Sequence, residues 1–342
     1  LAAKLSMFKP GLAMLTRRRL IALSAATALL PDLRGRAAFA QTPPGGWPNR
    51  SVHLIVPLAA GGPTDSVARI LAEQLTKMWG HEVVVENKSG GGTNIGNEFV
   101  AHAEPDGYTA LYGTSSLAVN TGLYRSLSYD PVADLAPVSL TAKFPFFMFV
   151  PNSSPAKTVM EFVAYVKAHQ GKLIMGSPGT GSAPHLAEEL FLQMAGIQMT
   201  HSPYRGAAPA FIDLIPGRID CYFGSGELLN YSRSAQVRAL ATTGAQRAAA
   251  EPELPTITEA GIPGYVVDSW QGVFMPAKTP PVIVRKMSAD IVTALAQPEI
   301  KDKLARSAYA AQGSTPDELR KFLKVDTEKW NAVIKTAGIK IE

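Results

Sequence analysis

The stretch VPLAAGGPTDS, at residues 56–66, decides the fold class of this chain. An apolar run at residues 52–56 predicts a buried strand, and the run stops before Gly61 and Gly62. Apolar residues then recur at positions 67, 70, 71, 75 and 78, which predicts a helix with one face in the core. Strand and helix patterns alternate in this way along most of the chain. We therefore expect an α/β fold with mainly parallel sheets flanked by helices.

A second unit of the same kind begins near Phe144, where an apolar strand pattern starts afresh. A mature chain of about 300 residues exceeds what one hydrophobic core usually holds, so two lobes are expected. A further strand and several helical patterns follow residue 265, and the last helix opens with a capping box at residues 315–318. We expect this C-terminal part to pack on the first lobe. Lobe 1 then comprises residues 41–143 plus 266–342, lobe 2 comprises residues 144–265, and the ligand site is the cleft between them.

The first forty residues have the features of a secretory signal. Three arginines at positions 17–19 precede an apolar run at residues 20–30 that is too short to span a bilayer. The sequence Ala38-Phe39-Ala40 then matches the small-residue pattern of a cleavage site. The arginines also fit a twin-arginine signal, so the sequence does not decide between Sec export and twin-arginine export. We predict a signal peptide at residues 1–40 and a periplasmic location.

Charge and motifs weigh against several classes of function. Residues 1–40 carry seven basic residues and one acidic residue, so the formal net charge of +5 becomes −1 over residues 41–342. The sequence has no stripe of basic residues interleaved with aromatic residues, which is the pattern that indicates nucleic-acid binding. The sequence also lacks the hydrolase elbow, the P-loop, the zinc helix and the dinucleotide fingerprint. The six histidines and the single Cys221 have no metal-ligand spacing. We expect no nucleic acid, no metal, no cofactor and no catalysis.

Two glycine-rich loops share one design, because each ends a predicted strand and opens a predicted helix. The first is GGPTD at residues 61–65, and the second is GSPGTGSAPH at residues 176–185. Glycine lets a ligand approach the backbone, and a helix start leaves N–H groups unpaired with a partial positive charge. Such a turn binds an anion without a basic side chain. The loops add hydroxyl donors from Thr64, Ser177, Thr180 and Ser182.

Single residues near these loops have two interpretations each. Thr64 or Asp65 either takes part in binding or caps a helix. His185 either contacts a ligand or has a plain capping role. Arg205 either pairs with a carboxylate or forms an ordinary surface ion pair.

Several stretches together carry a family likeness. They are AGGPTD at 60–65, ENKSGGGTNIG at 86–96, PDGYT at 105–109, GTGS at 179–182 followed by His185, YRGAAPA at 204–210 and ELPT at 253–256. In this order, over residues 48–340, the chain resembles the Bug-type receptors, which are the periplasmic solute-binding proteins of tripartite tricarboxylate transporters. The resemblance implies a two-lobed periplasmic binding protein that closes on a small carboxylate like a Venus flytrap.

The resemblance also implies which residues hold the ligand. In the first lobe it points to Ala60, Gly61, Gly62, Thr64, Asp65 and Ser115, and in the second lobe to Ser177, Gly179, Thr180, Ser182, His185 and Arg205. The chain departs from the family pattern at residues 224–226, where Gly-Ser-Gly stands in place of the usual aspartate. Because of that departure, the resemblance does not say which ligand group the distal end of the pocket binds. One expectation is that this end accepts a longer or less polar ligand.

The sequence favours a monomeric, non-catalytic receptor that captures a small di-, tri- or aromatic carboxylate and delivers it to the membrane permease subunits of the transporter. One alternative is an enzyme of the same two-lobed class, with Asp65 or His185 as acid or base. Another is a sensor that presents the ligand to a signalling kinase. Sequence alone does not separate transport from sensing, since both need the same two-lobed device.

Overall fold

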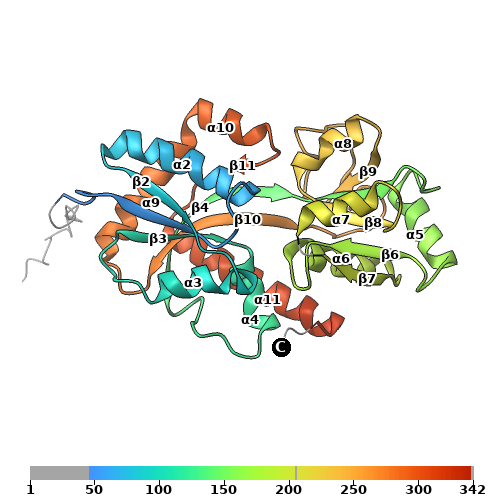
Figure 1. The fold of residues 1–342 in the computed structure, drawn as a ribbon, viewed down its shortest axis with the longest axis horizontal. Coiled ribbons are helices and arrows are strands. Elements are labelled where there is room, and N and C mark those ends of the chain that lie inside the picture. Colours follow the sequence, from blue (N-terminus) through green and yellow to red (C-terminus); the bar gives the residue numbers. More distant parts are fainter. Residues whose placement is uncertain (1–45, 205, 340–342) are drawn as a thin grey trace, which may run out of the picture. The chain divides into compact units, whose positions relative to one another are not determined.

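A first mixed sheet is formed by strands from both ends of the chain. The computed structural model describes residues 46–204 and 206–339. The strand order is β11-β4-β10-β3-β1-β2 (Figure 1). The strands are β1 (Val52–Val56), β2 (Val83–Asn87), β3 (Thr109–Thr114), β4 (Leu135–Pro145), β10 (Asp268–Pro276) and β11 (Ala310–Ala311). Because β10 lies between β3 and β4, the C-terminal part of the chain completes a sheet that the N-terminal part begins.

A second sheet is formed by strands from the middle of the chain, in the order β7-β6-β8-β5-β9. Its strands are β5 (Phe147–Pro151), β6 (Ile174–Ser177), β7 (Thr200–Pro203), β8 (Cys221–Gly224) and β9 (Val237–Thr242). Only Phe146 separates β4 of the first sheet from β5 of the second. The lobe boundaries at residues 143–144 and 265–266 stay a prediction.

Helices lie against both sheets (Figure 1). Those that contact the first sheet or pack on one another beside it are α2 (Pro63–Trp79), α3 (Asn94–Ala101), α4 (Ser116–Leu123), α9 (Pro281–Ala296), α10 (Pro298–Ala305) and α11 (Pro316–Ala337). Those around the second sheet are α5 (Val159–Ala168), α6 (Ala183–Ala195), α7 (Ala207–Leu214) and α8 (Leu229–Arg233). Short 3-10 turns, η1 (Gly91–Thr93) and η2 (Gly226–Leu228), precede α3 and α8.

The predicted α/β fold is confirmed, but both sheets are mixed rather than mainly parallel. Strand β1 pairs parallel with β2 and β3, whereas β10 pairs antiparallel with β3 and β4. In the second sheet β6 pairs parallel with β7 and β8, whereas β5 pairs antiparallel with β8 and β9. Parallel neighbours need a crossover connection, usually a helix. Strand β5 follows β4 of the first sheet after a single residue, whereas β10 follows β9 of the second sheet after residues 243–267. Each of these two strands runs opposite to both of its neighbours in its own sheet.

Helix α2 shows how the opening stretch folds. Its predicted apolar stripe is confirmed, because Val67, Leu71 and Leu75 are buried in one cluster with the side chains of β1. Each fully buried side chain of this kind contributes roughly 1.5–3 kcal/mol. The helix ends at Gly80, which takes the left-handed conformation with φ of 69°. The packing therefore fixes the start of α2 at the end of β1, where the glycine-rich loop lies.

Candidate ligand-binding site

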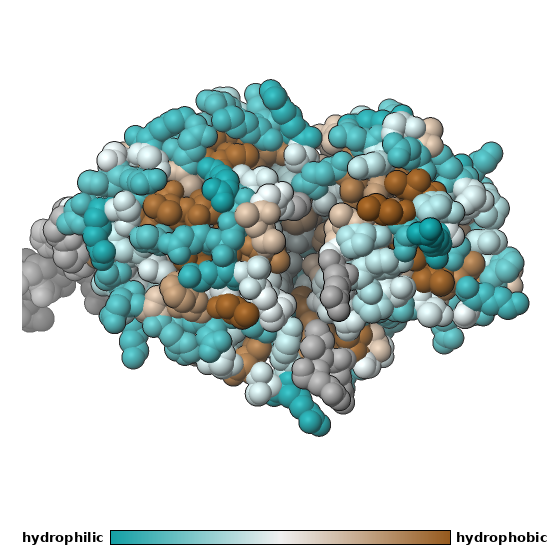
Figure 2. Space-filling model, viewed as in Figure 1, coloured by the Kyte–Doolittle hydropathy of each residue, from teal (hydrophilic) through white to brown (hydrophobic). Residues whose placement is uncertain are grey.

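A pocket of about 520 Å³ is lined by residues from elements of both sheets. On the face shown in Figure 2, hydrophilic residues predominate and the surface is hollowed near the middle of the view. Across the described part of the chain, no Lys, Arg, His, Asp or Glu lines this pocket. Its polar groups are therefore hydroxyls, amides and backbone groups.

The first residues of several helices meet at this pocket. Thr64 of α2, Ser116 of α4 and Ala183 of α6 line the pocket, as does Ala207 at the start of α7. The first N–H groups of a helix have no partner within the helix and carry a partial positive charge. Together these helix starts make a site that favours an anion without a basic side chain.

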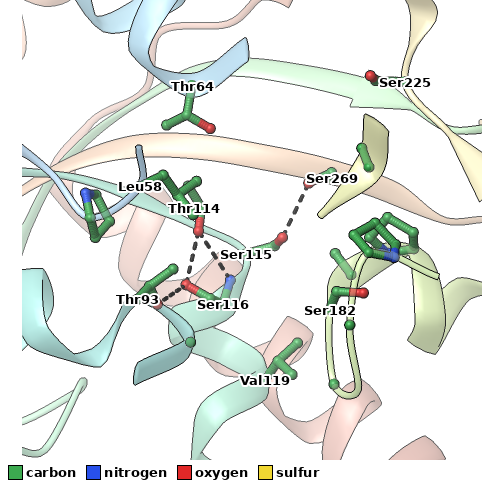
Figure 3. A pocket seen from close by; sticks show the side chains of 18 of the residues that line it. Leu58, Thr64, Thr93, Thr114, Ser115, Ser116, Val119, Ser182, Ser225 and Ser269 are labelled. Atoms are coloured by element: carbon green, nitrogen blue, oxygen red, sulfur yellow. Dashed lines mark hydrogen bonds between the residues drawn. The ribbon is translucent and has the colours of Figure 1, made fainter. Parts of the chain in front are cut away.

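Hydroxyl groups form a hydrogen-bonded cluster on one side of the pocket (Figure 3). The Oγ of Ser116 lies 2.7 Å from Thr93 Oγ1 and 2.8 Å from Thr114 Oγ1. The Nδ2 of Asn120 donates to the Gly92 carbonyl at 3.0 Å. Thr93 has a φ of 82°, an uncommon value for a residue with a side chain. Such strain is concentrated at functional sites, and here it accompanies a threonine that is 7% exposed and lines the pocket.

Strand β10 positions the start of α4. The backbone N–H of Ser115 donates to the carbonyl of Trp270 at 3.1 Å, and its Oγ lies 3.1 Å from Ser269 Oγ. The neighbouring Gln271 donates through Nε2 to Thr64 Oγ1 at 3.2 Å. The central strand therefore ties two helix starts together, which explains how Ser115, one of the residues implied by the resemblance, comes to line the pocket.

The first glycine loop contributes Thr64 to the pocket, whereas Ala60, Gly61, Gly62 and Asp65 are not among the lining residues. The buried Asp65 carboxylate instead accepts from Gly61 N at 3.0 Å, Asn87 Nδ2 at 3.0 Å and Arg69 Nε at 2.9 Å. Burial acts to raise the pKa of Asp65, but these hydrogen bonds outweigh it and hold the pKa below its usual value. Asp65 thus holds the loop in shape, and ligand contact by the loop's backbone stays a prediction.

The second glycine loop contributes Gly179, Thr180 and Ser182 to the pocket. Ser182 also caps α6, because its side chain accepts from the backbone N–H of His185 at 3.4 Å. The glycines and the serine therefore place the α6 start at the pocket, and their contact with a ligand stays a prediction. Arg205 lies outside the described residues, so its role stays a prediction.

Ser177 and His185 lie behind the second loop rather than on the pocket surface. His185 Nδ1 accepts from Gly181 N at 3.0 Å, and Ser177 Oγ lies 2.7 Å from His201 Nε2. The two imidazole rings stack with centroids 3.8 Å apart. Burial, followed by the charge of His185, lowers the pKa of His201 to about 4. These side chains thus support the loop, and their own contact with a ligand stays a prediction.

Sequence reasoning missed most of the residues that line the remaining walls. They include Thr93, Thr114, Ser116, Asn120, Phe144, Phe146, Tyr222, Ser225 and Tyr309. The triple glycine at 90–92 was the available signal for Thr93, because it marks a loop of unusual backbone conformation. Gly224 and Ser225, from the stretch that departs from the family pattern, do line the pocket. A Cβ at Gly224 would come within 2.5 Å of Leu228 Cδ1 and 2.8 Å of Tyr222 Cε1, so a larger residue there would force these side chains to shift.

Other kinds of site are not found in the described structure. Among residues 46–204 and 206–339, no group of three or more His, Cys, Asp or Glu side chains is placed to hold a metal ion. Within the same residues, no helix is both long and apolar enough to cross a membrane. The secretory signal predicted at residues 1–40 lies outside the described residues.

Comparisons with known proteins agree with this architecture. The family model of the tripartite tricarboxylate transporter family receptor, TctC, matches residues 67–339. A protein from the tcbD-tcbE intergenic region of Pseudomonas sp. (strain P51) is 35% identical over 95% of this chain and 96% of its own length. BugT of Bordetella pertussis is 34% identical over 86% of this chain and 92% of its own length.

Solved structures are similar to this chain over their full length. R. palustris Rpa4515 with adipate has a TM-score of 0.80 and 34% identity, covering 86% of this chain and 100% of its own. The periplasmic binding protein BugD has a TM-score of 0.76 and 32% identity, covering 86% of this chain and 100% of its own. MatC from Rhodopseudomonas palustris with bound malate has a TM-score of 0.73 and 30% identity, covering 84% of this chain and 100% of its own. The chain has the two-lobed fold of periplasmic binding proteins and belongs to the tripartite tricarboxylate transporter receptor family.

Proposed function

We propose that this protein is a periplasmic, non-catalytic receptor that captures a small organic carboxylate and delivers it to the membrane subunits of a tripartite tricarboxylate-type transporter. The signal at residues 1–40 exports it, and it acts as a monomer. The ligand makes contacts with both lobes when they close, so it stabilises the closed state that the permease recognises.

The observation that carries this proposal is the meeting of helix starts around a pocket without charged side chains in the described residues. A carboxylate satisfies unpaired N–H groups and hydroxyls at such a place, and the helix dipoles favour its negative charge. Related receptors were solved with adipate and with malate, which are both carboxylates.

The hydrogen bonds of the two candidate acid–base residues support a receptor over an enzyme. The carboxylate of Asp65 accepts hydrogen bonds from three donors within the protein, namely Gly61 N, Arg69 Nε and Asn87 Nδ2. His185 Nδ1 is occupied by the N–H of Gly181, and its Nε2 lies 3.4 Å from Glu189 Oε1. Neither side chain faces the pocket, whereas an acid or base must reach the proton that it transfers.

The test is a thermal-shift screen of the purified protein, refolded once to remove carried-over ligand. The panel contains dicarboxylates, tricarboxylates, aromatic carboxylates, amino acids and nicotinamide cofactors. At a thousandfold excess over Kd, a ligand stabilises the protein by about 4 kcal/mol. Stabilisation by a carboxylate class supports the proposal. Stabilisation by a cofactor alone, or turnover of a bound carboxylate, contradicts it.

A matched pair of variants on α4 locates the site. Ser116→Ala removes a hydroxyl of the pocket cluster and should weaken binding about tenfold, because a hydrogen bond to a charged group is lost. Thr121→Ala removes a hydroxyl from the same helix at a position that does not line the pocket, and it should leave the affinity unchanged. Equal affinities for all three proteins in calorimetric titrations would contradict the location.

A further inference from the structure

The pocket has a second end whose chemistry differs from that of the hydroxyl cluster. In Figure 3, Ser225 lies across the pocket from Thr93 and Ser116. Ser225 and Tyr309 both line the pocket, and both donate through their hydroxyls to the carboxylate of Glu227. The bond from Tyr309 to Glu227 Oε1 is 3.1 Å long. An acidic group therefore stands directly behind this end of the pocket.

Among the described residues, no Lys, Arg or His forms an ion pair with Glu227. Its negative charge therefore acts on whatever occupies the pocket nearby, and like charges repel strongly in a partly desolvated site. The helix starts attract an anion, whereas the end at Ser225 and Tyr309 disfavours a second one. This charge asymmetry favours a ligand with one carboxylate.

Tyr222 adds a free hydrogen-bonding group to the pocket. Its side chain is 1% exposed and lines the pocket, and its hydroxyl has no hydrogen-bond partner in the described structure. A hydroxyl at a pocket wall that makes no hydrogen bond within the protein is free to pair with a polar group of a ligand. Burial raises the pKa of Tyr222, which keeps the hydroxyl neutral and able to donate.

Aromatic rings cover the space near this end. The ring of Phe144 lies 4.6 Å from that of Tyr309 and 5.9 Å from that of Phe146, measured between centroids. All three residues line the pocket. Such walls fit a flat apolar body, because aromatic pairs gain from offset and edge-to-face contacts.

We propose that the pocket selects an aromatic monocarboxylate that carries an uncharged hydrogen-bonding group on its ring. The carboxylate lies at the hydroxyl cluster of Thr93 and Ser116, and the ring lies against Phe144. Tyr222 binds the ring substituent, and Glu227 excludes a second carboxylate. This inference rests on the proposed receptor function and specifies its ligand.

The test is calorimetric titration of the purified protein with 4-hydroxybenzoate, benzoate and adipate. We expect 4-hydroxybenzoate to bind about tenfold more tightly than benzoate, because the hydroxyl pairs with Tyr222. Tyr222→Phe should make the two affinities equal. Equal affinities already in the wild-type protein, or an unchanged ratio in Tyr222→Phe, would overturn the role of Tyr222.

The second arm concerns Glu227. Adipate should bind more weakly than both benzoates, and Glu227→Gln should strengthen adipate binding about tenfold by removing the repulsion. The control Glu251→Gln removes a carboxylate that is paired with Arg233 away from the pocket, and it should change nothing. Adipate binding more tightly than the benzoates would overturn this inference and leave the receptor function intact. Absence of binding by any carboxylate would overturn both.

Discussion

Asp65 should contribute to stability because it joins the first glycine loop to α2 and β2. Its side chain is 5% exposed and accepts three hydrogen bonds. The substitution Asp65→Asn preserves the shape, but it removes the charge and replaces one acceptor oxygen by an NH₂ group. Hydrogen bonds to charged groups contribute roughly 1.5–3 kcal/mol each, and the exposed Arg69 contributes little. We expect the free energy of unfolding to fall by about 2 kcal/mol at pH 7.

The effect should depend on pH in a defined direction. The pKa of Asp65 in the folded protein lies below its ordinary value of 3.8. The unfolded chain therefore binds the proton first as the pH falls, and the stability contributed by Asp65 is present above pH 3.8 and lost below it. The difference between wild-type protein and Asp65→Asn should be smaller at pH 3.5 than at pH 7.

Urea unfolding followed by circular dichroism at both pH values measures this difference. The control Asp317→Asn removes a carboxylate that is 83% exposed and paired with Arg320 on the surface. It should change the free energy of unfolding by less than about 1 kcal/mol. A loss for Asp65→Asn no larger than that of the control, or an equal loss at pH 7 and pH 3.5, would refute the assignment of Asp65 as the residue that holds the loop.

Two further predictions concern a buried carboxyl group and a closely packed glycine. Glu188 is fully buried, its Oε1 accepts from Phe223 N at 2.8 Å and its Oε2 has no partner in the described structure. Burial raises its pKa, so the folded protein retains a proton that the unfolded chain releases above pH 4.5, and stability falls as the pH rises. Glu188→Gln should therefore stabilise the protein more at pH 8 than at pH 5 in urea unfolding, and an equal effect at both would contradict this. A Cβ at Gly226 would lie 2.7 Å from Ala308 Cβ, so Gly226→Ala should cost about 1–3 kcal/mol in thermal unfolding. Adding Ala308→Gly should recover part of that loss, and strictly additive effects in the double-mutant cycle would contradict the contact.

The sequence was sufficient for features that depend on local chemistry. The helical stripe that begins at Val67 and the capping box at Thr315 and Glu318 are both present in the structure. Such features depend on residue spacing and short-range hydrogen bonds, which the sequence displays directly. The position of Ser182 at the start of α6 was predictable for the same reason.

Features that depend on distant partners were not predictable. Strand β4 begins at Leu135, well before the break that the sequence suggests near Phe144, because β10 pairs with its whole length. The same pairing makes the first sheet mixed. A one-dimensional pattern does not show which strand pairs with which.

The sequence also did not show which residues of each glycine loop face the pocket and which form hydrogen bonds within the loop. Gly61 and Asp65 form an internal hydrogen bond, while Thr64 turns toward the pocket. Side chains adjacent in sequence thus differ in role because the start of a helix points neighbouring residues in different directions. The triple glycine at 90–92 marks an unusual loop in the sequence, but the positive φ of Thr93 itself depends on how that loop packs.

A crystal structure of the protein with its bound carboxylate tests the central claim most directly. We predict carboxylate oxygens within about 3 Å of hydroxyl or N–H groups at the starts of α2, α4, α6 or α7. Density for the carboxylate outside this pocket would contradict the account, and so would a carboxylate placed against the rings of Phe144 and Tyr309 instead of the helix starts.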